Sequence, residues 1–490
     1  MDMEKVKRSI FFWTLAALFL VIAPAIIMRA TGLNFDLNRG VFVHSGTLSL
    51  KVNPKNPTVY LDGELVKSGK INRINNSFNI SGLIPRDYEI KITNEGFQSW
   101  SKKIDIHSGL SSEFWNIVLA RNSYERTPYN LSDVNKFFIS PKNRRLAYVK
   151  EAGSNLEVGI LETRSNLVEK NFFLNGWKFI ETEAEENIEW SPEEDYLSIP
   201  VKKVSAEDNE IYYFIINLKT EETSILNQLT GKNNLSKARW DPKDKDYLFF
   251  ISEKTLYRAN VKKASEIIAI SEDVSAYELS YNAVYFSEQP NELIYKSELD
   301  GSGEKIQITN QFPLSPVLPI KKLIVYDETR IAFINQANEL FIFNQGEHEN
   351  YFKKIGDEIM SLQFSNDGKK LLFWTDYEAS VYFLRDWMVQ PNRSEDEIQN
   401  IIRYSEPIKN IQWFKDYEHI IFSDNKQLRM VEIDTRDRSN YVDITETQTP
   451  SFLIYNNAEE KLFFTDNIPN EKTNGIFSII FLEPSNILGL

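Results

Sequence analysis

One motif, an apolar residue followed by a polar turn and a tight apolar run, recurs over residues 122–490. The segments 190–198 and 364–374 are clear copies of it. One reference residue from each copy gives eight positions that lie 39–51 residues apart: Ile139, Trp190, Trp240, Leu279, Val325, Phe364, Trp413 and Ile454. A repeat of about 40–50 residues, each made of a few short strands, is typical of a β-propeller, because radially packed blades cover one another's faces. The eight copies favour eight blades, with seven as the alternative.

Each copy predicts a hairpin whose first strand ends at the aromatic or apolar residue and whose second strand is the apolar run. Only one further strand, at 475–481, is predicted after the last copy, so the last blade is one strand short. Residues 123–131 precede the first copy and are expected to fill that gap, which would leave no open edge. Trp190, Trp240 and Trp413 share one register. They could line a binding face, but the shared register favours one repeated packing position between blades.

The N-terminal region contains a run of 20 uncharged residues, 9–28. This is about the length that a helix needs to cross a hydrocarbon core of ~30 Å. Lys5, Lys7 and Arg8 precede the run, so the positive-inside rule predicts that residues 1–8 form a cytoplasmic tail and that 9–28 form a transmembrane signal anchor. The rest of the chain is then extracytoplasmic. The alternative is a cleaved signal peptide, with residues 23–25 as an A-x-A site.

A small β domain is predicted over residues 44–121, after a linker at 29–43. Residues 46–52 and 88–93 alternate apolar and polar side chains, as half-buried strands do. Asp62 and Gly63 follow a short apolar strand, and Asp-Gly is a strong hairpin signal because both residues tolerate positive φ.

The residues of this β domain resemble the PEGA domain family. The matching positions are Pro54, Val59, Tyr60, Asp62, Gly63, Leu83, Pro85, Tyr88, Gly96, Phe97 and Trp100. The family's Gly-Ala pair is Asn56-Pro57 in this chain, and the Gly after its proline is Arg86. The resemblance implies a β-sandwich-like module of envelope proteins in bacteria and archaea, and it implies no catalytic residues.

The repeat copies at 190 and 364 are similar to the F/W-S-P-D-G-K-x-L-x-F repeat of TolB-like propellers. The match is fair at Ser140-Pro141 and Asp241-Pro242 and weak in the copies at 279 and 325. This resemblance spans residues 122–490. It implies a scaffold that binds proteins or peptides, or the accessory domain of an enzyme.

Composition excludes several kinds of chemistry. The chain has no Cys, which excludes disulfides, thiolate metal sites and cysteine nucleophiles, and it has only four His. Residues 122–490 contain 41 Lys+Arg against 60 Asp+Glu, a net charge of −19, while residues 1–121 carry +5. Repulsion from phosphates makes a nucleic-acid partner unlikely to bind this acidic region. No G-x-S-x-G, P-loop or HExxH motif occurs.

The remaining candidate residues favour structural roles. The carboxylate clusters at 183–186 and 394–397 could bind Ca²⁺, but they lack the spacing of a calcium loop and are interpreted as solvated charge. His348 and His419 are isolated in the sequence, and surface or satisfied-core roles suffice for both. Trp100 and Trp115 could stack on a sugar, but their alternating strands favour core packing. We therefore predict no catalytic, cofactor-binding or metal-binding residues.

These observations predict an all-β protein with an N-terminal transmembrane helix, a small β-sandwich-like domain and a β-propeller. The predicted function is that of a non-enzymatic, membrane-anchored envelope protein that binds a protein, peptide or glycan partner. One alternative is a hydrolase or lyase with an acidic site in the propeller channel. Another is a purely structural envelope scaffold.

Overall fold

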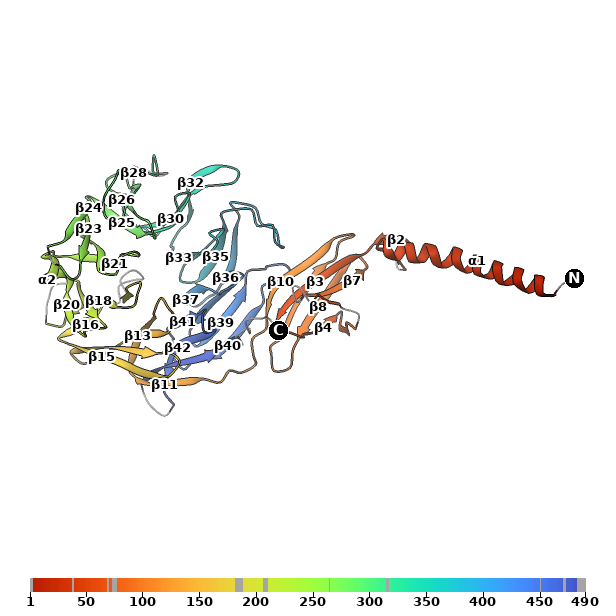
Figure 1. Cartoon of the computed structure of the whole chain (residues 1–490), viewed down its shortest axis with the longest axis horizontal. Coiled ribbons are helices and arrows are strands. Elements are labelled where there is room, and N and C mark those ends of the chain that lie inside the picture. The colour runs from red at the N-terminus through yellow and green to blue at the C-terminus, as the bar shows by residue number, and fades with distance from the viewer. Residues whose placement is uncertain are drawn as a thin grey trace. The chain divides into compact units, whose positions relative to one another are not determined.

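The computed structural model describes residues 3–37, 39–67, 70–72, 77–180, 188–205, 210–263, 265–313, 317–449, 451–469 and 473–482. The chain forms two compact units (Figure 1). Unit 1 consists of Met1–Ser123 together with two later segments, Met388–Asn392 and Asp434–Val442. Unit 2 consists of Tyr124–Trp387, Arg393–Ile433 and Asp443–Leu490.

Unit 1 begins with the helix α1 (Met3–Ala30). Its segment Val6–Met28 is long and apolar enough to cross a membrane, a property that signal sequences share. The residues that follow, which the sequence places in a linker, form an antiparallel hairpin of β1 (Leu33–Asp36) and β2 (Val41–His44).

The rest of unit 1 is a sandwich of two four-stranded sheets. The first has the order β10-β3-β7-β6 and the second β5-β4-β8-β9. Their strands are β3 (Gly46–Asn53), β4 (Thr58–Leu61), β5 (Glu64–Leu65), β6 (Lys70–Asn72), β7 (Ser77–Leu83), β8 (Asp87–Thr93), β9 (Trp100–Asp105) and β10 (Ser111–Val118). Alternation along these strands buries one face of each sheet, and Leu48, Ile90 and Phe114 are among the residues of the shared core. Asp62 and Gly63 both have positive φ in the tight turn between β4 and β5, as predicted.

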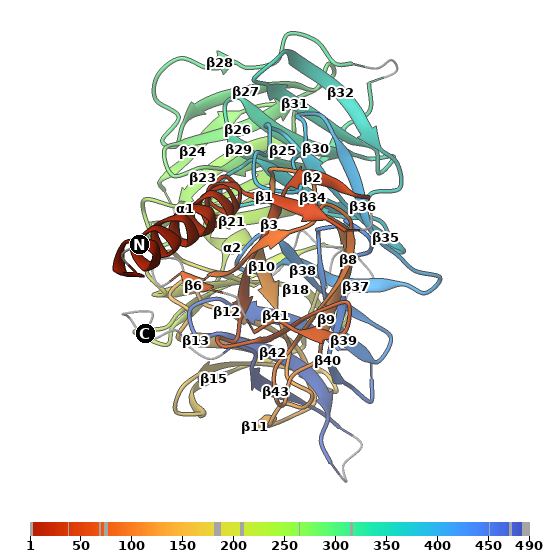
Figure 2. The same ribbon diagram turned by 90° about the vertical axis from the view of Figure 1, so that its right-hand side faces the viewer.

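Unit 2 contains eight antiparallel sheets that follow one another around a ring (Figures 1 and 2). Blade 1 is β12 (Val134–Ile139), β13 (Arg145–Ala152), β14 (Asn155–Glu162) and β15 (Leu167–Asn175). Blade 2 is β16 (Trp177–Phe179), β17 (Glu189–Trp190), β18 (Tyr196–Lys203), β19 (Tyr212–Asn217) and β20 (Thr223–Ile225), and the short helix α2 (Leu226–Thr230) follows it. Blade 3 is β21 (Leu235–Trp240), β22 (Tyr247–Ser252), β23 (Thr255–Asn260) and β24 (Ile267–Ser271). Blade 4 is β25 (Val274–Leu279), β26 (Ala283–Glu288), β27 (Leu293–Glu298) and β28 (Ile306–Gln307).

The second half of the ring repeats this plan. Blade 5 is β29 (Ile320–Asp327), β30 (Arg330–Asn335), β31 (Leu340–Gln345) and β32 (Asn350–Gly356). Blade 6 is β33 (Ser361–Phe364), β34 (Lys370–Trp374), β35 (Glu378–Phe383) and β36 (Ile398–Arg403). Blade 7 is β37 (Ile408–Trp413), β38 (His419–Asp424), β39 (Gln427–Glu432) and β40 (Tyr441–Glu446). Blade 8 is β41 (Leu453–Asn456), β42 (Lys461–Asn467), β43 (Asn474–Ile480) and, from the start of unit 2, β11 (Thr127–Ser132).

Apolar clusters join each blade to the next. One cluster packs blade 1 on blade 2, and the others continue in order up to the contact between blades 6 and 7. Phe414 of blade 7 contacts Tyr455 of blade 8, with ring centroids 4.9 Å apart. A last cluster packs Phe463 of blade 8 with Phe137 of blade 1. Unit 2 is therefore a closed, eight-bladed β-propeller, as the sequence predicted.

The three repeated tryptophans occupy one inter-blade position. Trp190, Trp240 and Trp413 are all buried. Each indole Nε1 donates to a backbone carbonyl of the preceding blade: Trp190 to Phe138 (3.4 Å), Trp240 to Glu189 (3.2 Å) and Trp413 to Gln363 (3.1 Å). Their structural interpretation is confirmed, since a buried indole N–H needs an acceptor and finds the same one in each blade.

The ring closes through β11, which pairs antiparallel with β43. Thr127 lies opposite Ser478, and Pro128 lies opposite Phe477. The residues before the first repeat therefore supply the missing strand of the last blade, as predicted from the count of strands.

Candidate functional site

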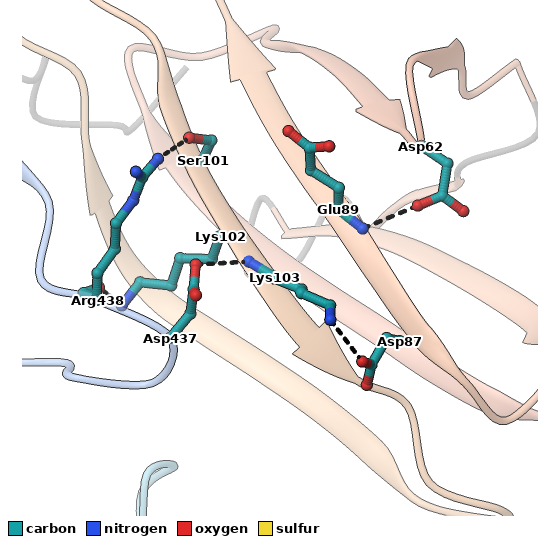
Figure 3. A pocket seen from close by; sticks show the side chains of 8 residues that line it. All are labelled: Asp62, Asp87, Glu89, Ser101, Lys102, Lys103, Asp437 and Arg438. Carbon is teal, nitrogen blue, oxygen red and sulfur yellow. Dashed lines mark hydrogen bonds and ion pairs between the residues drawn. The ribbon is translucent and has the colours of Figure 1, made fainter.

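A polar cavity of about 320 Å³ lies in unit 1 along the edge strand β9 (Figure 3). It is lined by Asp62, Asp87, Glu89, Ser101, Lys102, Lys103, Asp437 and Arg438. The last two belong to the segment Asp434–Val442, which is part of unit 1 although in the sequence it follows β39 and runs into the start of β40.

Lys102 is the central residue of this region. Its side chain is fully buried. The ammonium Nζ donates to the backbone carbonyls of Asp434 (2.6 Å), Arg436 (3.0 Å) and Arg438 (2.8 Å). The Asp434 carboxylate lies 3.5 Å from the same nitrogen. Three carbonyls and one carboxylate thus replace the water that a buried ammonium loses.

The same segment satisfies the open edge of the sheet. The outward amide of Lys103 donates to Asp437 Oδ2 (2.9 Å), and that of Ser101 approaches Asn440 Oδ1 at 3.5 Å. Arg438 Nη2 donates to the Ser101 hydroxyl (2.7 Å), as Figure 3 shows. Side-chain oxygens therefore accept hydrogen bonds from the outward amides of β9, as the carbonyls of a neighbouring strand would. They protect an edge that could otherwise pair with another chain.

Arg436 and the segment Met388–Asn392 complete the contact. The Arg436 guanidinium lies 3.8 Å from the centre of the Phe114 ring, and its Nη2 donates to the Glu113 carbonyl (2.8 Å). Gln390 donates to the Ser111 carbonyl (2.8 Å) and accepts from the Glu113 amide (2.9 Å). Burial raises the pKa of Asp434, but the hydrogen bond from Arg436 and the charges of Lys102 and Arg436 outweigh it and hold that pKa below its ordinary value.

This arrangement positions chain segments and offers little to a ligand. Most of the polar groups that line the cavity already bond to other residues of unit 1, as the contacts of Lys102, Lys103 and Arg438 show. Asp62 pairs with Arg86 at 2.6 Å. Figure 3 shows the Glu89 carboxylate without a partner among the residues drawn. None of the sequence patterns described above predicted this region. Its signal was Lys102, a charge on the same face of the strand as the buried Trp100 and Ile104.

The centre of the propeller was the place predicted for an alternative enzyme site. The first strands of blades 3 and 5 lie towards this centre, because Lys237 Nζ in β21 reaches the carbonyl of Lys321 in β29 (2.6 Å) although blade 4 lies between them in the ring. Two acidic residues of first strands, in β17 and β25, share one structural partner. Arg239 contacts Glu189 at 2.6 Å and Glu278 at 3.5 Å, in the strands on either side of it.

Glu292 is a second acidic group that links blades. It is buried, and burial raises its pKa, although hydrogen bonds to the carboxylate oppose that effect. Its two oxygens accept from the Ser275 hydroxyl (2.7 Å) and from the Ile320 amide at the start of blade 5 (3.1 Å). A carboxyl with a perturbed pKa is a common catalytic candidate, but both oxygens here are engaged, one with Ser275 of blade 4 and the other with Ile320 of blade 5.

His419 is a satisfied core residue, as the sequence suggested. It is buried, and its Nδ1 lies 2.8 Å from Asp416 Oδ2. Lys370, also buried, donates to the Tyr417 carbonyl and pairs with Glu418, and so links β34 of blade 6 to blade 7. Burial lowers the pKa of His419, but the charge and hydrogen bond of Asp416, with the charges of Glu432 and Glu418, raise it above its ordinary value.

This raised pKa predicts a pH-dependent stability. A histidine whose pKa is higher in the folded state stabilises the fold fully below its unfolded pKa of about 6.5, and that contribution is lost as the pH rises through the folded pKa. The melting temperature should therefore fall between pH 6 and pH 9. In His419→Gln this fall should be smaller than in the parent chain. Parallel melting curves across that range would contradict the assignment.

The other predicted candidates lie apart from the cavity. His348 is exposed and hydrogen-bonds Asp386 at 3.0 Å. Its ring nitrogen and the carboxylates of Glu347 and Glu395 lie within 4.8 Å of one another. Within 394–397 the carboxylates have separate partners: Glu395 accepts from the Glu347 amide (2.6 Å), Asp396 from the Tyr382 hydroxyl (2.8 Å), and Glu397 lies 3.2 Å from Arg393. The cluster at 183–186 lies outside the described residues.

The two tryptophans of the small domain differ in environment. Trp100 is buried and contacts Phe114 edge-on, with ring centroids 5.3 Å apart, so core packing is confirmed. Trp115 is half-buried, and its Nε1 donates to the Glu113 carboxylate at 2.8 Å.

Comparisons with known proteins add nothing more specific than the fold. No protein-family profile matches the chain, and no curated protein matches it. Among solved structures, the Dos1 propeller is 10% identical, with 74% of this chain and 95% of that one covered and a TM-score of 0.48. Sqt1 of Saccharomyces cerevisiae is 10% identical, with 74% and 100% covered and a TM-score of 0.45. An oligogalacturonate lyase in complex with manganese is 11% identical, with 74% and 98% covered and a TM-score of 0.37.

These values are too low to carry an argument about activity, and the sheets themselves establish the propeller. Over the described residues the structure is all-β apart from α1 and α2, and it combines a β-sandwich with an eight-bladed propeller.

Proposed function

We propose that this chain is a membrane-anchored envelope protein whose propeller binds a protein, peptide or glycan partner and performs no chemistry of its own. In this proposal α1 is an uncleaved anchor with residues 1–8 in the cytoplasm, and the rest of the chain lies outside. Residues 44–121 form a PEGA-like module and residues 122–490 a TolB-like propeller. The proposal also holds that the protein needs no cofactor.

The observation that carries the proposal is the rigid, closed ring of eight blades. A propeller presents a broad face whose loops are held by a stable scaffold, which suits recognition. Four ionisable groups described in the ring support binding over catalysis, because they are used to join blades or satisfy the core: Arg239, which is partly exposed, and the buried Glu292, Lys370 and His419. An acidic catalytic site at the centre would need carboxylates free to meet a substrate.

Charge narrows the class of partner. Residues 122–490 carry a net charge of −19. Any electrostatic part of the binding is therefore expected to involve a cationic protein or divalent ions, and it should weaken with salt.

The test immobilises the full chain in lipid nanodiscs and exposes it to envelope extract, with empty nanodiscs as the control. We expect a discrete partner that cross-links to unit 2 and is retained less at about 500 mM than at about 50 mM salt. No retention above the control would contradict the proposal and favour a structural scaffold. Turnover of peptides, esters or glycans that is lost in Glu292→Gln, while the melting temperature is retained, would establish an enzyme instead.

A further inference from the structure

The hairpin β1–β2 exposes an unusual number of apolar side chains. Phe35 is 46% exposed, Leu37 86%, Val41 48% and Phe42 57%. Phe35 and Phe42 lie opposite each other in the hairpin, and their rings meet edge-on with centroids 5.0 Å apart. The two rings therefore pack on each other and leave their outer faces uncovered.

Leu110 belongs to the same surface. It is 60% exposed and ends a loop that lies against the base of the hairpin. In this loop the Ser108 hydroxyl donates to the His44 carbonyl (3.1 Å), and the Thr47 amide donates to the Leu110 carbonyl (3.0 Å). We call Phe35, Leu37, Val41, Phe42 and Leu110 the juxtamembrane patch. Among the described residues of unit 1 beyond α1, two other large apolar side chains are exposed to this degree, Leu65 and Met388.

The hairpin is fixed to the end of α1. The Thr31 amide donates to the Ile27 carbonyl (2.9 Å), which continues the helix to its last turn. Ser45, which follows β2, donates through its amide (2.7 Å) and its hydroxyl (2.9 Å) to the Gly32 carbonyl. β1 therefore begins, and β2 ends, beside the C-terminal end of the helix, as Figure 1 shows for β2.

This attachment limits how far the patch can lie from a membrane. Each strand has four residues, so at about 3.3 Å per residue the tip lies about 13 Å from the base of the hairpin, whichever way the hairpin points. The apolar span ends at Met28. The polar layer on each side of a bilayer is about 5–8 Å thick. A patch attached this close to the end of the span can reach the interface, where aromatic and aliphatic side chains are favoured.

The hairpin is also suited to a lipid surface by its charge. Its one carboxylate, Asp36, is buried and accepts from the Arg39 amide (3.2 Å), with the Arg39 guanidinium 3.7 Å away. The tip therefore exposes a cationic group beside the apolar side chains and keeps its acidic group covered. Anionic headgroups attract such a surface.

We propose that the juxtamembrane patch inserts into the headgroup region of the bilayer and forms a second, interfacial contact beside α1. This inference rests on the proposed membrane anchor and adds the lipid surface as the partner of a defined part of unit 1. Its consequence is that unit 1 is held against the bilayer by two contacts and does not swing on a single flexible connection.

The absence of Cys from the chain allows a clean test. Leu37→Cys and Phe42→Cys are labelled with an environment-sensitive NBD dye in the full chain, reconstituted in vesicles of phosphatidylethanolamine and phosphatidylglycerol. Leu65→Cys, 49% exposed in the same unit, is the matched control. We expect blue-shifted emission at positions 37 and 42, and quenching by lipids spin-labelled near the headgroup at least about twofold stronger than at position 65.

Each outcome decides the question. If the chain floats with the vesicles but the emission at positions 37 and 42 equals that at position 65, the patch does not insert into the bilayer. That result overturns this inference and leaves the anchor intact. Blue-shifted emission that spin-labelled lipids do not quench shows a protein cover, such as a second copy, and also overturns it. A chain that does not float with vesicles removes the anchor and this inference together.

Discussion

Lys102→Met is expected to destabilise unit 1 by about 3–5 kcal/mol, because the change removes one partner of a fully buried charge network. Methionine has a similar length and keeps the packing, but it donates no hydrogen bond. The carbonyls of Asp434, Arg436 and Arg438 would each lose the hydrogen bond from the ammonium, and the Asp434 carboxylate would lose a neighbouring positive charge.

The expected result is an earlier thermal transition, together with faster amide hydrogen exchange in residues 434–442 and along β9. The matched control is Lys103→Met. Lys103 is the adjacent residue of the same type, its side chain is 63% exposed, and it pairs with Asp87 at the surface, so its loss should change little. Native exchange rates for 434–442 in Lys102→Met would show that Lys102 does not hold this segment.

Tyr129→Ala is expected to destabilise the propeller by about 3–5 kcal/mol, the range for removal of a buried aromatic ring. Tyr129 lies in β11, the strand that closes the ring, and is 3% exposed. Its ring contacts Phe463, with centroids 5.8 Å apart, and its hydroxyl lies 3.2 Å from the Ser478 hydroxyl. Loss of the ring would loosen blade 8 at the place where it meets blade 1.

The control for this change is Tyr281→Ala, in the same unit, because Tyr281 is 68% exposed. Chemical unfolding followed by circular dichroism should shift to lower denaturant for Tyr129→Ala and stay unchanged for Tyr281→Ala. Deletion of 127–132 should have a larger effect, since it removes all the pairing of β11 with β43 and opens an edge. Equal midpoints for Tyr129→Ala and the parent chain would mean that the ring does not depend on this closure.

The repeated parts of the fold could be predicted from the sequence. The period of the motif gave eight blades, and the count of strands after the last copy gave the closure by β11, because both depend on local patterns. The shared register of Trp190, Trp240 and Trp413 gave their packing position for the same reason.

The parts of the fold that depend on contacts between residues far apart in the sequence could not be predicted. The segments at 388–392 and 434–442 belong to unit 1, and no local pattern in them indicates a partner more than 270 residues away, such as Ser111 for Gln390. Lys102 in the buried register of β9 was the one local sign. The hairpin β1–β2 was assigned to a linker because its apolar residues have no clear alternation and no Asn-Gly or Asp-Gly turn.

The measurement that tests the account most directly is cysteine labelling with a membrane-impermeant maleimide, since the parent chain has no Cys to react. Tyr281→Cys reports the propeller and Lys7→Cys reports the N-terminal tail. In intact spheroplasts we expect label on Tyr281→Cys alone, and after permeabilisation we expect label on both, in chains of full length. Label on Lys7→Cys from outside, protection of Tyr281→Cys, or loss of the Lys7→Cys signal from the mature chain by cleavage would contradict the proposed anchor.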